Sequence, residues 1–140
     1  MKKNTQSGFS LIELLLVVTI IGIIAALGVP SLQKGIKAAD NRAALAQLRT
    51  LSSSQLAYFS QKGRFGRLSE LNTIQGGGYG DGTTSLIKAR FIYEMSPLNP
   101  TDLDLKDGYT IIATGIDQIN TVPVILSVNQ TGQITAPFAD

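Results

Sequence analysis

The chain has 140 residues, of which 44% are apolar and 16% charged, and its formal net charge is +2. It contains neither cysteine nor histidine. This excludes a disulfide framework, thiolate metal sites and thiol nucleophiles, and it removes the commonest general base. No paired constellation of Ser, Lys, Tyr or carboxylate groups takes their place, so we expect a protein that is not an enzyme. The length predicts one compact domain with an appendage.

The charges are unevenly distributed along the chain. From Lys34 to Arg67 there are seven basic residues and one acid, whereas from Phe91 to Asp140 there are six acids and one base. The two halves can neutralise each other within one fold or between neighbouring copies. No basic surface interleaved with aromatic residues is present, so we expect no nucleic-acid partner.

Phe9–Val29 is an apolar run of 21 residues with a single charge, Glu13. As a helix it spans roughly 31 Å, which matches a hydrocarbon core of about 30 Å. We therefore expect a membrane segment. The run is longer than the roughly 7–15 apolar residues of a secretory signal peptide. A small-x-small pattern at Ala26–Gly28 leaves removal of the whole segment as the alternative.

Glu13 needs an explanation, because a carboxylate at the centre of an apolar span costs about 2.5–3.5 kcal/mol and is functional by default. One interpretation is that Glu13, close to the start of the run, reaches the membrane interface. The other is a positive partner, yet no Lys or Arg lies between Lys3 and Lys34. Cleavage after Gly8 would free the Phe9 amine. The amine of a neighbouring copy could then pair with this carboxylate and fix the register between helices.

Residues 8–14, which read GFSLIEL, follow a short leader that carries a basic pair. With Gly22 and Pro30 downstream, this segment resembles the N-terminal signature of type IV pilins and type II secretion pseudopilins. The resemblance covers about the first 30 residues. It implies that a prepilin peptidase cleaves between Gly8 and Phe9, releasing residues 1–8 as a leader peptide and N-methylating Phe9. It also implies that Glu13 aligns an incoming subunit through the Phe9 amine of its neighbour.

The resemblance further implies partners and a location. Residues 9–30 would be a membrane anchor first and the packed core of a homopolymer later. Inner-membrane assembly machinery would be a partner, and the chain would leave the inner membrane for an extracellular pilus or a periplasmic pseudopilus. Without residues 1–8 the chain carries ten basic and ten acidic side chains. Near-neutral subunits can pack in large numbers without accumulating repulsion.

Gly22, Gly28 and Pro30 lower helix propensity towards the end of the apolar run. Pro30 offers no backbone donor and its ring crowds the Ala26 carbonyl, so we expect a bend or a loosening between these two residues. A static kink is one interpretation. The family resemblance implies the other, a flexible stretch that lets a filament extend under load.

Residues 31–60 continue the helix with an amphipathic pattern. Five positions share one predicted face: Leu45, Leu48, Ser52, Leu56 and Phe59. We expect this stripe to seat a small domain on the helix. The glycines of 62–66 predict where the helix ends.

Residues 61–140 are expected to form a head whose antiparallel strands pack against the helix, an α+β fold. Leu68–Ile74 reads as a short helix or an irregular turn. Gly76–Gly82 lacks the phosphate-binding glycine patterns, so it does not read as a nucleotide-binding loop. It reads instead as a flexible loop with several positive-φ positions. A hairpin turn is expected at Asn129–Gly132. The three or four predicted strands are Arg90–Met95, Tyr109–Thr114, Val122–Val128 and Gln133–Ala136. Because proline lacks a backbone donor, Pro123 requires either that the third strand lies at an edge of the sheet or that the proline stands at the start of this strand.

Asp102, Asp104 and Asp107 form the only acidic constellation with metal-ligand spacing. Calcium accepts several carboxylate oxygens from one loop, and the resemblance implies calcium in a C-terminal loop of major pseudopilins. The EF-hand pattern is not met, however, and Lys106 lies within the cluster. We therefore expect a solvated turn between strands and no cofactor, with a calcium site as the weaker alternative.

Taken together, the sequence predicts a structural subunit of a type IV pilus-like filament that polymerises through its N-terminal helix. A pseudopilin of a type II secretion system is the close alternative. A membrane-tethered binding domain that never polymerises is the alternative from another class. The last alternative predicts that a Glu13→Ala variant keeps its localisation and function.

Overall fold

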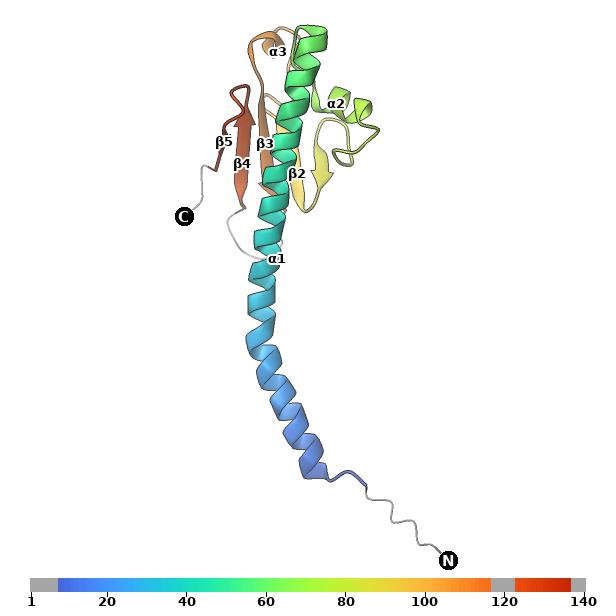
Figure 1. The fold of residues 1–140 in the computed structure, drawn as a ribbon, viewed down its shortest axis with the longest axis vertical. Coiled ribbons are helices and arrows are strands. Elements are labelled where there is room, and N and C mark those ends of the chain that lie inside the picture. The colour runs from blue at the N-terminus through green and yellow to red at the C-terminus, as the bar shows by residue number, and fades with distance from the viewer. Residues whose placement is uncertain (1–7, 117–122, 137–140) are drawn as a thin grey trace, which may run out of the picture. The chain divides into compact units, whose positions relative to one another are not determined.

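The computed structural model of the chain describes residues 8–116 and 123–136. It divides into two compact units, Met1–Ala38 and Ala39–Asp140, which are treated separately below. The elements in chain order are α1 (Leu11–Lys62), α2 (Leu68–Ile74), β1 (Leu86–Lys88), β2 (Phe91–Met95), α3 (Asp104–Asp107), β3 (Thr110–Gly115), β4 (Ile125–Asn129) and β5 (Ile134–Thr135) (Figure 1).

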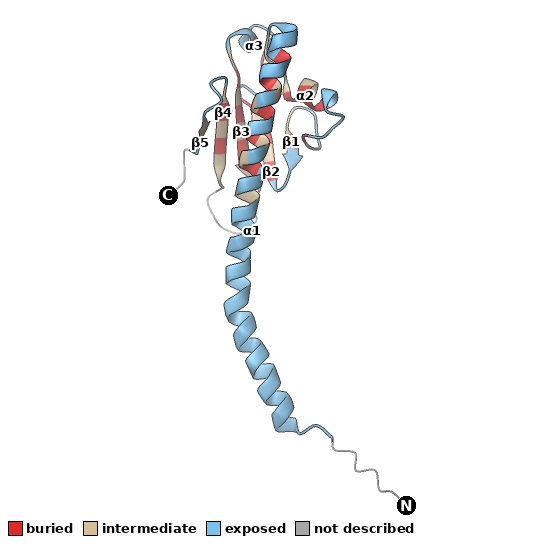
Figure 2. Cartoon of the chain, in the orientation of Figure 1, coloured by how far each residue is buried: buried red, intermediate tan, exposed pale blue. Residues whose placement is uncertain are grey.

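The first unit consists of the N-terminal part of α1 and the residues before it. Every described residue from Gly8 to Ala38 is exposed (Figure 2). An 18-residue window of α1 reaches a mean hydropathy of 2.7 with none of it buried. By length and composition the helix can therefore cross a membrane. Helical structure continues through Pro30.

The second unit holds a five-stranded antiparallel sheet in the order β1-β2-β3-β4-β5. Its central register pairs Met95 with Ile111 and Ile111 with Val128, three side chains on the buried face. The C-terminal part of α1 crosses this sheet (Figure 1). The expected α+β class with a long N-terminal helix and an antiparallel sheet is thus confirmed.

Most of the predicted elements of the head are present. The helix α2 has the predicted bounds and α1 ends at Lys62. The strand β2 begins one residue later than predicted, and β3 is shifted by one residue at both ends. Pro123 precedes β4, as its missing donor requires. Val122, at the start of the predicted third strand, lies outside the described residues. The turn between β4 and β5 closes with a bond from Gly132 N to Asn129 O of 2.9 Å.

The strand count was wrong, because the sequence analysis missed β1. A two-residue turn, Ala89–Arg90, joins β1 to β2, and both residues have positive φ, 50° and 64°. Such turns ordinarily use glycine or asparagine, so this one carries no sequence signal. Tertiary contacts hold it instead. Arg90 Nε lies 3.8 Å from Asp40 Oδ2, and Arg90 O accepts from Ile116 N at 2.7 Å.

The predicted face of α1 was also partly wrong. The residues that α1 buries against the sheet are Ala44, Leu48, Leu51, Gln55 and Tyr58. Of the predicted stripe only Leu48 is fully buried, whereas Leu56 is 69% exposed. The misassignment arose because Gln55 reads as a surface residue. The Gln55 side-chain amide accepts a hydrogen bond from Gly66 N and donates one to Gly66 O, both at 2.7 Å. The buried amide therefore keeps hydrogen-bond partners for its oxygen and its nitrogen.

Two segments predicted as solvated loops contribute to the core. Tyr79, within the glycine-rich segment, is 4% exposed, and its backbone N donates to Asn72 Oδ1 at 3.0 Å. Four glycines of this segment do adopt positive φ, as expected. Leu105, within the acidic segment, is 1% exposed on the single-turn helix α3. A single apolar residue among polar neighbours carries no periodicity that could reveal its burial.

Candidate functional site

The N-terminal part of the site is the junction that precedes α1. Gly8, Phe9 and Ser10 lie outside the helix, and the Phe9 side chain is 87% exposed. The leader residues 1–7, with both leader lysines, lie outside the described residues. An exposed non-helical peptide bond between Gly8 and Phe9 is the kind of backbone that a peptidase can engage.

Glu13 caps the first turn of its own helix. Its Oε2 accepts a hydrogen bond from Ser10 N at 3.0 Å, and Leu14 N donates to Ser10 O at 3.2 Å. Ser10 thus stands at the N-cap position with an acid three residues later, one half of a capping box. The sequence analysis missed this role, although the Ser-x-x-Glu spacing at 10–13 is its ordinary signal. The bond uses one carboxylate oxygen and leaves Oε1 available for a second partner.

The apolar part of α1 contains a hydroxyl and two glycines whose surroundings bear on how the helix packs. Thr19 Oγ1 donates to Leu15 O at 2.8 Å, which is how a hydroxyl is accommodated in an apolar environment. A Cβ built on Gly22 or on Gly28 would meet no atom within 4 Å. No packing among the residues that the structure describes therefore requires these glycines. Small residues on an apolar helix allow another helix to approach closely.

Pro30 lies inside α1 and leaves a gap in its hydrogen-bond ladder. Proline has no backbone N–H, so the Ala26 carbonyl one turn earlier loses its usual donor. The predicted flexibility of this stretch stays a prediction.

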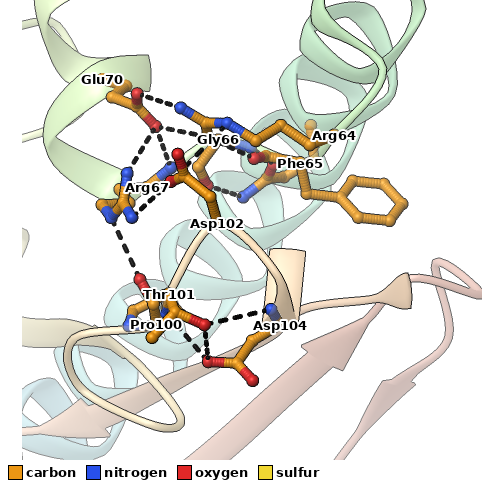
Figure 3. A network of polar contacts seen from close by, with 10 residues as sticks. Arg64, Phe65, Gly66, Arg67, Glu70, Pro100, Thr101, Asp102 and Asp104 are labelled. Carbon is orange, nitrogen blue, oxygen red and sulfur yellow. Dashed lines mark hydrogen bonds and ion pairs between the residues drawn. The ribbon is translucent and has the colours of Figure 1, made fainter. Parts of the chain in front are cut away.

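In the second unit an ion-pair network surrounds Glu70 (Figure 3). Arg64 donates to both carboxylate oxygens of Glu70, at 2.9 and 2.7 Å, and Arg67 N donates to Oε2 at 2.8 Å. The bidentate bond with Arg64 is the main reason that the pKa of Glu70 falls to about 2. The network joins the end of α1 to the start of α2. Its residues belong to no motif, and sequence reasoning missed them.

The same network reaches the acidic segment before β3. Arg67 donates from Nη2 to Asp102 Oδ1 at 2.5 Å and from Nε to Pro100 O at 3.1 Å. Asp104 Oδ2 accepts from the backbone and hydroxyl of Thr101, which lowers the pKa of Asp104. The loop between β2 and β3 is thereby tied to the start of α2.

The three candidate calcium ligands thus have separate surroundings. Asp102 pairs with Arg67, Asp104 with Thr101, and Asp107 forms no side-chain bond with the described residues. No group of three or more His, Cys, Asp or Glu side chains that could hold a metal occurs in residues 8–116 and 123–136. The calcium alternative stays a prediction.

An exposed apolar helix, a Gly–Phe junction before it and an acid at its first turn are the features of a prepilin-type N-terminus. The family described as "Prokaryotic N-terminal methylation motif" matches residues 3–29. The chain is 41% identical over 58 residues to a protein of Myxococcus xanthus (strain DK1622) named "Type IV major pilin protein PilA". It is 35% identical over 65 residues to "Type II secretion system core protein G" of Aeromonas hydrophila. The resemblance to the type IV pilin and type II secretion pseudopilin family is therefore confirmed.

These matches cover only part of each protein. They span 41% of this chain and 26% of the pilin, and 46% of this chain and 46% of the secretion protein. No solved structure matches the chain. The methylation motif and the exposed apolar helix together indicate membrane anchoring. The families to which the two relatives belong consist of structural subunits.

Proposed function

We propose that the chain is a structural subunit of a type IV pilus-like filament and that it polymerises through residues 9–30 after cleavage between Gly8 and Phe9. A prepilin peptidase removes the leader and methylates Phe9. The subunit waits in the inner membrane until the assembly machinery adds it to an extracellular filament. The second unit, which has a core of its own, forms the surface of that filament.

The observation that carries this proposal is that every described residue up to Ala38 is exposed in the apolar part of α1, where no contact among the described residues explains Gly22 and Gly28. Such a surface needs lipid or other helices around it, and Gly22 and Gly28 favour helices. Glu13 supports the same conclusion, because its free carboxylate oxygen can accept from the Phe9 amine of a neighbour while the other oxygen keeps its own helix capped. The gap at Pro30 supports a stretch that loosens when the filament is pulled.

A periplasmic pseudopilus of a type II secretion system is the second candidate. It is favoured by the coverage of the matches: the match to the secretion protein spans 46% of that protein, whereas the match to the pilin spans 26% of the pilin.

The two candidates differ in where the mature chain is found. We would shear filaments from the native cell and determine the intact mass and N-terminus of this chain in each fraction. An abundant chain that begins at methylated Phe9 in the sheared fraction is the result expected of a pilus subunit. A processed chain confined to the membrane fraction would favour a pseudopilin. A chain that keeps residues 1–8, or one cut near Gly28, would overturn both.

A Glu13→Ala variant separates polymerisation from mere tethering. We expect it to reach the membrane, to be cleaved and to yield at least about tenfold fewer filaments, because breaking a buried ion pair by removing one partner costs about 3–5 kcal/mol. Glu13→Gln is the matched variant, since its amide oxygen still caps Ser10 N but carries no charge. Normal filament yield from Glu13→Ala would support the tethered binding domain instead.

A further inference from the structure

The part of α1 that belongs to the second unit has an exposed face lined by small residues. The positions follow a spacing of three and four and are all exposed: Ala43, Ala46, Thr50, Ser53, Ala57 and Ser60. The hydroxyl of Thr50 donates to Ala46 O at 3.0 Å, and that of Ser53 donates to Arg49 O at 3.0 Å. A partner can therefore approach this small-residue face closely without stripping polar groups of their bonds.

Two arginines border the small-residue face. Arg42 and Arg49 are exposed and seven residues apart, so they lie on the same side of the helix, about 10 Å from each other. Neither guanidinium has an acidic partner among the described residues. Arg64, Arg67 and Arg90, by contrast, each lie within 4 Å of a carboxylate. Arg42 and Arg49 are thus the arginines of the head whose charge no acid among residues 8–116 and 123–136 matches.

An unmatched acid lies beside a groove of about 290 Å³ elsewhere in the second unit. The groove lies between α3 and the start of β3, and Asp104, Asp107, Pro97, Pro100 and Tyr109 are among its lining residues. Asp104 has one oxygen engaged by Thr101, whereas Asp107 has no side-chain partner in the described parts of the chain. Proline and tyrosine carbon surfaces beside a carboxylate suit the flat face and the charge of a guanidinium.

One copy of the chain cannot bring these features together. The groove lies at the level where α1 ends, since Phe65 N donates to Leu105 O on α3 at 2.8 Å. Arg49 is 13 residues before the end of α1, so it lies about 20 Å from that level along the helix. A second copy, parallel to the first and displaced along the helix by this distance, aligns its Arg49 with the groove.

We propose that the groove beside Asp107 receives Arg49 from the small-residue face of a second copy. This inference rests on the proposed filament. It adds to the helix bundle a contact between two heads displaced by about 20 Å, and charge complementarity fixes this offset. Copies that pair Glu13 with a Phe9 amine are displaced by only roughly 6 Å, so the two contacts join different pairs of copies. Because the two surfaces differ, the contact is head-to-tail and repeats without closing, as a filament requires.

Charge exchange in the full chain tests the proposal. We expect Arg49→Asp and Asp107→Arg each to lower the yield of sheared filaments about fivefold, because each places like charges together. The double variant should return the yield to within about twofold of the unsubstituted chain. Lys62→Asp, which reverses an exposed charge at the end of α1 away from the small-residue face, is the matched control and should leave the yield unchanged.

A cross-link gives an independent measurement. The chain has no cysteine, so Arg49→Cys and Asp107→Cys, expressed as separate chains in one cell, should form an oxidised dimer only when both are present. Filaments with normal yield from both single reversals, or a double variant no better than its parents, would overturn the inference while leaving the proposed filament intact. Absence of filaments from the unsubstituted chain would overturn the proposed function itself.

Discussion

Leu16 and Leu48 carry the same side chain on the same helix, yet Leu16 is 58% exposed and Leu48 is fully buried. The contrast extends to the units that hold them. From Gly8 to Ala38 no described residue is buried, whereas the second unit buries a single connected core drawn from α1, α2, α3 and the sheet. Hydrophobicity alone would predict the reverse, because the exposed N-terminal part of α1 is the more apolar of the two. What differs is whether the chain supplies a partner surface.

The comparison separates two sources of stability. Burying one leucine side chain contributes roughly 1.5–3 kcal/mol, and the second unit obtains this from its own strands. The first unit obtains nothing from the chain itself, so its apolar side chains gain free energy only from lipid or from other helices. Substitutions in the first unit should therefore affect assembly, and those in the second should affect folding.

The largest effect is expected from Leu48→Ala. It should lower the free energy of unfolding of the second unit by about 2–5 kcal/mol, because a cavity opens between α1 and the sheet. Leu16→Ala should leave it unchanged within about 0.5 kcal/mol. The measurement is urea unfolding in detergent micelles followed by near-ultraviolet circular dichroism, since all four tyrosines lie in the second unit. A loss of similar size from Leu16→Ala would contradict the separation of the two units.

A smaller effect is expected at Gln55, where the core accepts a polar side chain. Gln55→Leu should cost about 2–3 kcal/mol, because Gly66 N and Gly66 O lose the partners that lie 2.7 Å away. The same unfolding measurement applies. Leu56→Ala is the control, since Leu56 is 69% exposed and its truncation should change little. If Gln55→Leu were neutral or stabilising, the buried amide would not hold the turn after α1 in place.

Gln55 also shows why the sequence predicted the helix but not its buried face. Periodicity is enough to place α1, and the glycines of 62–66 are enough to place its end. The choice between two neighbouring faces depends on which polar residue finds a buried partner, and Gly66 becomes that partner only after the chain has turned back. A pattern that counts Gln as polar selects Leu56 instead, and the helix then appears rotated.

The sequence analysis missed the hairpin of β1 and β2 for a related reason. Sequence methods read such turns from glycine and asparagine, the residues that tolerate positive φ. Ala89 and Arg90 adopt it because tertiary contacts with Asp40 and Ile116 hold the turn. The turn at Asn129–Gly132 has the expected residues, and it was predicted correctly.

The methylation motif was predictable because it is a linear pattern, whereas the roles of its residues stay predictions. The Gly8–Phe9 junction and Glu13 are read directly from adjacent residues, and the comparisons with known proteins confirm the motif. The bond from Ser10 N to Glu13 follows from the Ser-x-x-Glu spacing, and the sequence analysis missed it. Residues that meet only in the fold, such as Arg49 and the groove beside Asp107, could not be predicted from the sequence.

The smallest of the expected effects concerns the ion pairs around Glu70 and their dependence on pH. Folding lowers the pKa of Glu70 from 4.5 to about 2, mainly through its hydrogen bonds with Arg64. The pair therefore stabilises the fold fully above pH 4.5, and this contribution is lost as the pH falls towards 2. Because Glu70 and Arg64 are 29% and 19% exposed, we expect Glu70→Gln to cost only about 1 kcal/mol at pH 7.

The unfolding free energies of the variant and the unsubstituted chain should converge between pH 4.5 and pH 2. Asp107→Asn, which removes an acid without an intrachain partner, should follow the unsubstituted chain at both ends of this range. A Glu70→Gln deficit that persisted unchanged at pH 2 would mean that the carboxylate charge is not what links the end of α1 to α2.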